Sequence, residues 1–295
     1  MTSLITAFLC LALGISLLSS LGWGAASDVK VISALFDPIY KSNADTRDLI
    51  IVWDIRMPRT LLATLVGASL AVSGAIMQGL FRNPLADPGI IGVSAGAGMG
   101  AVIAIVLGSL LPDPLGKFLG IYLVPFCAFI FAWLSTVVLY RVATRHGRTS
   151  VATMLLAGIA LAALSGALTG ILVYKADDNQ LRDIAFWNMG SVAAATWSKL
   201  GVAGPLIILG LIAAPFLAKS FNALALGEAE ARHLGINVQL TKTISILLVA
   251  ASVGASVAVT GGIGFVGIIV PHLLRLIQGP DHRGLFINAA LLGAI

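Results

Sequence analysis

Charged side chains are scarce in this chain. Asp, Glu, Lys and Arg make up 11% of its 295 residues, whereas hydrophobic residues make up 58%, and the mean hydropathy is +1.00. Soluble domains carry about a quarter charged residues. The shortage of charge excludes an ordinary soluble domain. We expect the chain to lie in membrane lipid and to bind no nucleic acid.

Cysteine is rare too. Cys10 and Cys127 both fall in predicted helices, so no disulfide is expected and small apolar packing is their simplest role. The four histidines are His146, His233, His272 and His282. They do not have the spacing of metal ligands, so we expect neither a metal nor another cofactor.

Long apolar runs are abundant, and a membrane-spanning helix needs about 20 apolar residues. Seven runs qualify: Leu4–Gly24, Thr60–Leu80, Gly89–Leu111, Phe118–Tyr140, Ser150–Tyr174, Leu200–Ala218 and Thr243–Thr260. An eighth, Ile263–Ile277, is short, and a ninth begins near Leu285 and is cut off at Ile295. We take the first run as a retained helix, with a signal peptide cleaved near Ala25 as the alternative. The sequence predicts an all-α polytopic membrane protein.

The distribution of cations orients these helices. The densest short basic loop, RVATRHGR at 141–148, is cytoplasmic by the positive-inside rule. With a cytoplasmic N-terminus, the inner connections hold nine cations and four carboxylates, which accounts for the whole net charge of +5. The polar stretch ALALGEAEARHLGIN at 223–237 is then cytoplasmic as well.

A short sequence occurs twice. GASLAVSGAI at 67–76 and GASVAVTGGI at 254–263 agree at seven of ten positions, and the same offset of 187 residues brings Pro84 onto Pro271. In this topology the two copies run in opposite directions, as in the inverted repeats of many transporters. Convergent packing of small residues is the alternative. The repeat favours a transport protein.

The means of driving transport are missing from the chain. The first seven runs contain no Asp, Glu, Lys, Arg or His, although secondary transporters commonly place such groups in their spans. Backbone carbonyls also bind sodium, so an ion-coupled carrier stays open as the alternative. No P-loop pattern occurs either. We therefore expect a pore subunit, not an enzyme, that is driven by a separate ATPase.

Two motifs resemble enzyme signatures. Gly262, Gly264 and Gly267 spell G-x-G-x-x-G, but they join two apolar helices instead of following a strand, so no dinucleotide site is expected. Residues 92–96 spell G-x-S-x-G, which leaves an intramembrane serine protease with His272 as its base as the enzymatic alternative. Glycines recur there every four residues, and this favours helix packing.

The polar stretch predicts one cytoplasmic helix over 221–235. Its apolar residues fall near one face: Phe221, Leu224, Ala231 and Leu234. Glu228 and Arg232 are spaced to form an ion pair, and Gly235 is a stop signal. The helix either lies on the membrane surface or provides the contact for an ATPase, and a transporter without its own motor favours the ATPase contact.

Six stretches carry a family resemblance: IRMPR at 55–59, LVGASLAVSGAIMQGLFRNPLADPGIIGVSAGAG at 65–98, MLLAGIAL at 154–161, FWNMGS at 186–191, LGEAEARHLGI at 226–236 and GFVGIIVPHLLRL at 264–276. Together they resemble the iron-chelate and cobalamin ABC importer permeases of bacterial inner membranes, which include the vitamin B12, ferric-siderophore and haem permeases. The resemblance implies ten transmembrane helices, the last absent or truncated here. It also implies a homodimer, or a pseudo-dimer of fused halves, with the translocation path at the dimer interface, and we expect a homodimer. It also implies two copies of a cytoplasmic ATP-binding subunit and a periplasmic substrate-binding protein.

The resemblance assigns roles to individual residues. Arg56 and Arg59 correspond to outer arginines that meet acidic residues of the binding protein, and an exposed pair of guanidiniums suits that role; anchoring to lipid headgroups is the alternative. Asn83 and Leu85 correspond to a cytoplasmic gate, and an Asn83–Pro84 turn is compatible with that role. The coupling helix that contacts the ATPase comprises Leu226, Gly227, Glu228, Ala231, Arg232, Leu234 and Gly235.

The substrate is suggested by one further stretch. Residues 176–182, ADDNQLR, lead into Phe186 and Trp187 and look most like the corresponding part of haem permeases. Ferric-siderophore permeases are similar, and cobalamin is a further alternative. We expect haem to be the transported compound.

Overall fold

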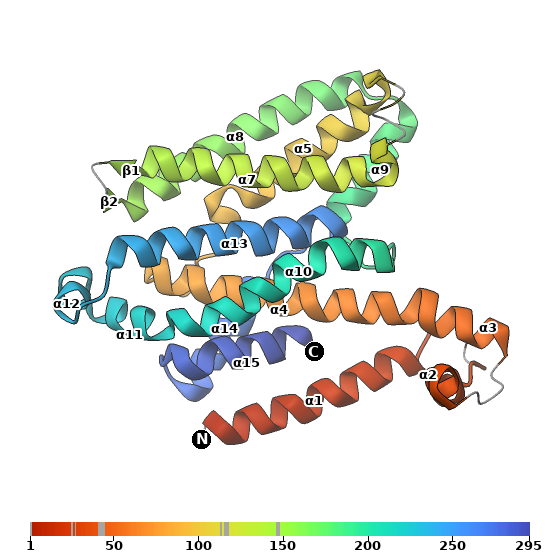
Figure 1. Cartoon of the computed structure of the whole chain (residues 1–295). Coiled ribbons are helices and arrows are strands. Elements are labelled where there is room, and N and C mark those ends of the chain that lie inside the picture. Colours follow the sequence, from red (N-terminus) through yellow and green to blue (C-terminus); the bar gives the residue numbers. More distant parts are fainter. Residues whose placement is uncertain are drawn as a thin grey trace.

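The computed structural model describes residues 2–24, 26, 28–40, 45–112, 114, 118–145 and 148–295, so His146 lies outside it. Helices dominate these residues (Figure 1). In the first half they are α1 (Thr2–Gly22), α2 (Val31–Tyr40), α3 (Thr46–Leu49), η1 (Ile50–Arg56), α4 (Met57–Phe81), η2 (Pro88–Ile91), α5 (Val93–Leu107), η3 (Gly108–Leu110), η4 (Gly120–Tyr122) and α7 (Leu123–Ala143).

A short hairpin follows α7. Its strands, β1 (Thr144–Arg145) and β2 (Arg148–Thr149), have two residues each and form the only strand pair among the described residues. The second half then consists of α8 (Val151–Lys175), α9 (Asp178–Met189), α10 (Trp197–Ala213), η5 (Ala214–Leu217), α11 (Ala218–Leu226), α12 (Glu228–His233), α13 (Val238–Thr260), α14 (Val266–Gln278) and α15 (His282–Ala294).

Seven helical stretches of the described chain are long and apolar enough to cross a membrane: Ser3–Gly22, Thr46–Phe81, Val93–Leu110, Gly120–Ala143, Val151–Lys175, Trp197–Leu226 and Val238–Thr260. Each overlaps one of the seven predicted runs, although the second and the sixth are longer than predicted, and α14 is the shorter eighth. The prediction of an all-α polytopic membrane protein is therefore confirmed. The second stretch is long because α3, the π-helical η1 and α4 are continuous.

The connections sort to the two ends of the bundle. The hairpin β1–β2, α11 and α12 lie at one end, and α2, α3 and α9 lie at the other (Figure 1). The basic loop at 141–148 and the polar stretch at 223–237 thus share an end, as the charge distribution predicts. We refer to this end as cytoplasmic.

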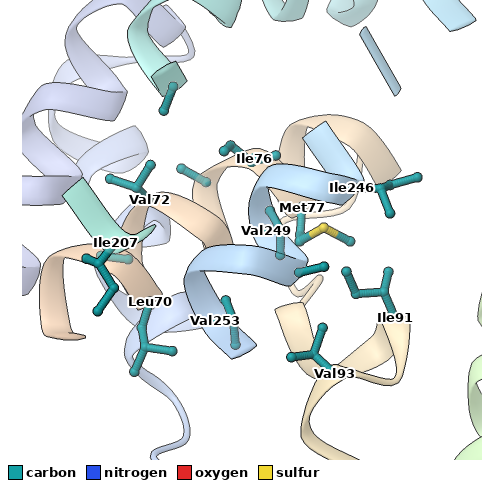
Figure 2. Packing of buried hydrophobic residues seen from close by; sticks show 14 of the residues in the cluster. Leu70, Val72, Ile76, Met77, Ile91, Val93, Ile207, Ile246, Val249 and Val253 are labelled. Carbon is teal, nitrogen blue, oxygen red and sulfur yellow. The ribbon is translucent and has the colours of Figure 1, made fainter. Parts of the chain in front are cut away.

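Helices α4 and α13 form the core. Every residue of α4 from 68 to 81 is buried. Figure 2 shows Val72, Ile76 and Met77 of α4 near Val249 and Val253 of α13, within one apolar cluster. Helices α5, α7 and α8 lie on one side of this pair, and α1 and α15 lie on the other (Figure 1).

The two copies of the repeated sequence meet in this core. Helices α4 and α13 begin at opposite ends of the bundle and therefore run in opposite directions (Figure 1). The Oγ atom of Ser256 donates a hydrogen bond to Oγ of Ser69 at 3.2 Å, and these two serines are separated by the repeat offset of 187 residues. Equivalent positions thus contact each other, as expected for two copies that face one another in opposite directions.

Glycines permit close helix contacts at several crossings. A Cβ atom at Gly74 would overlap the backbone of Gly267 in α14, and one at Gly100 would overlap the backbone of Cys127 in α7. Gly96, in the G-x-S-x-G sequence, likewise packs against α7. The packing interpretation of this sequence is thus confirmed, and the G-x-G-x-x-G sequence forms the connection from α13 to α14, without a strand.

Two helices at the outer end are absent from the predictions. Helix α2 is a short amphipathic helix, and α9 is polar enough to have been counted as an outer connection. The start of α9 does have a sequence signal. Asp177 and Gln180 form a capping box, in which each side chain accepts a hydrogen bond from the backbone N–H of the other residue.

Candidate functional site

The predicted helix over 221–235 is two helices. Helix α11 ends at Leu226, and Gly227 follows with φ of +133° and ψ of 155°, a conformation that only glycine adopts readily. Helix α12 then begins at Glu228 and ends at His233, and Gly235 has φ of +80°. The prediction of one continuous helix is therefore wrong, because Gly227 breaks it. We call residues 226–235 the coupling segment.

The break changes which residues the coupling segment exposes. Phe221, Leu224 and Ala231, which were predicted to lie near one face, are all buried. Leu234 was predicted to share their face, but its side chain is 63% exposed, and that of Leu226 is 68% exposed. Two leucines thus face outward at the cytoplasmic end on either side of α12, where a subunit that binds this end would cover them.

Glu228 has two cationic partners. Its carboxylate lies 3.8 Å from Nη2 of Arg232, which confirms the predicted i,i+4 pair. A shorter contact of 2.7 Å joins Glu228 Oε1 to Nζ of Lys242 in α13. Lys242 also donates a hydrogen bond to the carbonyl oxygen of Thr149 in β2, at 3.0 Å. This contact, between residues 93 positions apart, is not apparent from the sequence.

A cavity of about 310 Å³ opens beside these groups. It is bounded by β2, α12 and the start of α13, and its lining includes Arg148, Arg232 and Asn237. The side chains of Arg148 and Arg232 are both exposed. The cytoplasmic end therefore presents a recess with two exposed guanidiniums next to the coupling segment.

The predicted gate residues form a turn. Helix α4 ends at Phe81 and is capped by Arg82, which has a left-handed backbone with φ of +49°. Oδ1 of Asn83 accepts a hydrogen bond from the backbone N–H of Leu85 at 3.0 Å, and the carbonyl of Asn83 accepts one from Ala86 N–H at 3.1 Å. The side chain of Leu85 is 65% exposed. The predicted turn is confirmed, and the gate role stays a prediction.

The two predicted docking arginines differ in their surroundings. Arg59 is exposed, as predicted. Arg56 is buried, and its guanidinium donates hydrogen bonds to the carbonyl oxygens of Leu21 at 2.6 Å, Gly22 at 3.1 Å and Ala26 at 2.6 Å. The prediction of two exposed guanidiniums is wrong for Arg56, because the C-terminal carbonyls of α1 need donors and this side chain supplies them.

An aromatic cluster joins α11, the helix that leads into the coupling segment, to α15. The ring of Phe221 stacks on His282 with centroids 5.4 Å apart and meets Phe286 edge-on at 5.8 Å. Nδ1 of His282 lies 2.9 Å from Oδ1 of Asn222, whose amide donates to Asp281 at 2.6 Å. The backbone N–H of Arg283 and this amide lower the pKa of the exposed Asp281. This cluster is not apparent from the sequence, because its members come from two helices that are far apart along the chain.

The arrangement defines a class of protein: a polytopic helical membrane protein with a bent polar segment at its cytoplasmic end. No group of three or more His, Cys, Asp or Glu side chains that could hold a metal ion occurs among the described residues.

The chain belongs to the FecCD transport family, whose family model matches residues 9–295. This confirms the resemblance found in the sequence. The chain is accordingly a transport subunit and a multi-pass protein of the bacterial inner membrane, of the permease type found in ABC importers.

Individual relatives agree with this assignment. The hemin transport system permease protein HmuU of Yersinia pestis is 44% identical over 291 residues, which cover 99% of this chain and 84% of that protein. The vitamin B12 import system permease protein BtuC of Citrobacter koseri is 41% identical over 249 residues, which cover 84% of this chain and 73% of that protein.

A solved structure shares the fold. It shows an inward-facing conformation of a protein assigned as a metal-chelate type ABC transporter. The TM-score is 0.84 at 32% sequence identity, and the match covers 98% of this chain and 86% of that one.

Proposed function

We propose that this permease imports haem from the periplasm into the cytoplasm. The observation that carries the proposal is the 44% identity to the Yersinia pestis hemin permease along 99% of the chain. The polar entrance to α9, residues 176–182, supports it through its resemblance to haem permeases. The chain itself performs no chemistry and holds no cofactor, and ATP hydrolysis takes place on a partner subunit.

Cobalamin is the second candidate. The Citrobacter koseri vitamin B12 permease is almost as similar, at 41% identity, although its match covers less of the chain. Ferric siderophores form a third class of cargo that the family resemblance allows.

Uptake into proteoliposomes separates these candidates. The permease is reconstituted with its ATP-binding subunit and its binding protein, and ATP-dependent accumulation of haem, cobalamin and a ferric siderophore is compared. Haem accumulation that exceeds the other two by at least about tenfold supports the proposal, and preferential accumulation of either competitor overturns it. Uptake driven by an ion gradient without ATP would instead support a secondary carrier.

The coupling segment is the proposed contact for the ATP-binding subunit. Its exposed leucines, Leu226 and Leu234, supply apolar area, and Arg232 with the neighbouring recess supplies positive charge. Such a combination suits a partner surface with a hydrophobic centre and acidic groups around it. Two ATP-binding subunits bind, one to each permease copy of a homodimer.

Helix α8 is the proposed face for the second permease copy. Only three of its 25 residues are buried in the single chain: Met154, Gly158 and Ser165. Gly166 and Gly170 have no neighbouring atoms within 4 Å of an added Cβ. Small residues on an open helix face suit close packing against another helix in lipid.

At the opposite end, Arg59 is the proposed contact for acidic groups of the periplasmic binding protein. Arg56 contributes indirectly, because it fixes the C-terminus of α1 beside this surface. At the cytoplasmic end, Asn83 and Leu85 are the proposed gate, in which the Asn83 turn holds the Leu85 side chain outward.

A further inference from the structure

Lys242 is a buried cation close to the cytoplasmic start of a membrane-spanning helix. It is the only Lys or Arg in α13, and only 4% of its surface is exposed. A buried ammonium group is stable only when hydrogen-bond acceptors or an opposite charge surround it. The position of Lys242 thus calls for specific partners, and these partners reveal its role.

The ammonium group of Lys242 bridges two other elements. It donates to Oε1 of Glu228 in α12 at 2.7 Å and to the carbonyl oxygen of Thr149 in β2 at 3.0 Å. The donor in both bonds is the charged ammonium group, so both are stronger than hydrogen bonds between neutral groups. Through one side chain, the coupling segment is joined to the hairpin between α7 and α8.

A second set of bonds ties the hairpin to α13 and α7. Oε1 of Gln239 accepts from Thr149 N–H at 3.1 Å, and Nε2 of Gln239 donates to Thr149 Oγ1 at 2.8 Å and to the Tyr140 hydroxyl at 3.1 Å. The Tyr140 hydroxyl also lies 2.6 Å from Oγ1 of Thr243. None of these bonds reaches α12.

The link through Lys242 is not duplicated. Among the described residues, no other hydrogen bond or ion pair connects the hairpin, directly or through one side chain, to α12. The cavity of about 310 Å³ lies between Arg148 of the hairpin and Arg232 of α12, so the two elements are not packed tightly together there. Among the polar contacts of the described residues, the ammonium group of Lys242 alone joins the two elements directly.

We propose that Lys242 is a positioning residue that makes α12 and the hairpin β1–β2 move together during transport. A displacement of α12 by the ATP-binding subunit then reaches the α7–α8 connection through the Glu228–Lys242–Thr149 bridge. This inference rests on the proposed contact between the coupling segment and the ATP-binding subunit.

The test compares three variants in the complete complex. Lys242→Met keeps the length and bulk of the side chain but removes both bonds. Lys242→Arg keeps a cation with several donors and is the conservative control. Because the single Met variant leaves Glu228 without its closest partner, the double variant Glu228→Gln/Lys242→Met removes both charges and is used where the single variant does not assemble.

Hydrogen–deuterium exchange reports whether the two elements respond together. Exchange is measured in nanodiscs for peptides that cover the hairpin and α12, in the nucleotide-free complex and in the complex trapped with ADP and orthovanadate. Both peptides change on trapping in the wild-type complex. In Lys242→Met the α12 peptide still changes, whereas the hairpin response falls to less than a third of the wild-type response. Lys242→Arg restores it.

The number of ATP molecules hydrolysed per haem imported gives a second readout. It rises at least about fivefold in Lys242→Met and stays within about twofold of wild type in Lys242→Arg. A purely structural lysine would lower the yield of folded complex without changing this ratio in the complex that remains.

The outcomes separate the two proposals. A normal hairpin response together with an unchanged ratio of ATP to haem in both Met variants overturns the role of Lys242 and leaves the ATPase contact standing. A wild-type complex in which α12 itself does not respond to trapping overturns the ATPase contact, and the role of Lys242 with it.

Discussion

At the scale of single residues, Gln78 compensates for a proline in a neighbouring helix. Pro271 lies inside α14 and has no N–H to offer to the carbonyl oxygen of Gly267, four residues earlier. Gln78 in α4 is fully buried, and its Nε2 lies 3.1 Å from the carbonyl oxygen of Ile268 and 3.5 Å from that of Gly267. A side chain from one helix thus supplies a donor near the break in another.

Replacing this glutamine tests its contribution to stability. Gln78→Met preserves volume and removes the donor, so we expect the free energy of unfolding to fall by about 0.6–1.7 kcal/mol, the range for hydrogen bonds between membrane helices. Unfolding in a titration with SDS measures the change. Ser198→Ala, at an exposed position in α10, is the matched control and should change nothing. Equal stability of the two variants would contradict the role of Gln78.

Arg56 and Arg59 are three residues apart and should respond differently to mutation. Arg59→Glu should weaken docking of the binding protein by roughly tenfold at low salt, with a smaller effect at high salt, because the charge is exposed.

Arg56→Met should lower the free energy of unfolding by roughly 1.5–3 kcal/mol, because it leaves the C-terminal carbonyls of α1 without a charged donor. Binding and SDS-unfolding assays on both variants distinguish these effects. Unaltered docking in Arg59→Glu would contradict the proposal that Arg59 contacts the binding protein.

At the scale of elements, the shape of the coupling segment depends on Gly227. A Cβ atom there would displace only the flexible end of the Glu230 side chain, but the backbone angles are unfavourable for any residue with a side chain. The bend directs α12 back towards Lys242 and exposes Leu226. Changing residue 227 should therefore alter the orientation of the whole of α12.

Gly227→Ala should uncouple ATP hydrolysis from uptake. The substitution costs roughly 1–3 kcal/mol of backbone strain, which α12 relieves by changing its angle to α11. We expect the uptake of haem per ATP hydrolysed to fall at least about fivefold while the protein still reaches the membrane. Gly201→Ala, in an open part of α10, is the control. Wild-type coupling in Gly227→Ala would show that the bend is dispensable.

The elements differ in how far the sequence predicts them. The membrane spans follow directly from apolar runs, since lipid leaves a spanning segment little choice but a helix. The break at Gly227 does not, because glycine is also tolerated inside helices and its neighbours here are strong helix formers. The burial of Arg56 was beyond prediction as well. Its partners are backbone carbonyls 30 to 35 residues earlier. Every residue has such a carbonyl, so the sequence does not show which ones accept these hydrogen bonds.

At the scale of the whole molecule, the bundle is unevenly packed. Helices α4 and α13 are mostly buried, whereas 11% of the most apolar window of α8 and of α1 is buried. The two exposed helices lie on opposite sides of the bundle (Figure 1). Both helices carry open glycines, Gly14 and Gly22 in α1 and Gly166 and Gly170 in α8. Only those of α8 are four residues apart, the spacing that lets two helices pack closely in lipid, and this favours α8 as the proposed face for the second permease copy.

Cysteine cross-linking tests this assignment. In a background with Cys10 and Cys127 replaced by Ala, single cysteines are introduced at exposed positions along 156–171 of α8 and oxidised in native membranes. We expect disulfide-linked dimers at every third or fourth position, because only one face of the helix meets its counterpart. Exposed positions of α10, such as Val202 and Leu209, should give none. Equal cross-linking along both helices would contradict the proposed face.

The bare contact between Gly74 and Gly267 has a consequence for movement. Where two helices cross at a pair of glycines, sliding one helix along the other would bring a larger residue into the contact. A change in the angle between the helices keeps the two glycines together. Because Gly267 is the second residue of α14, the crossing anchors the start of this helix, and nearly all of its length lies beyond the contact. A push on the far end of α14, at Gln278, would therefore tilt the helix about its anchored start without shifting it along α4.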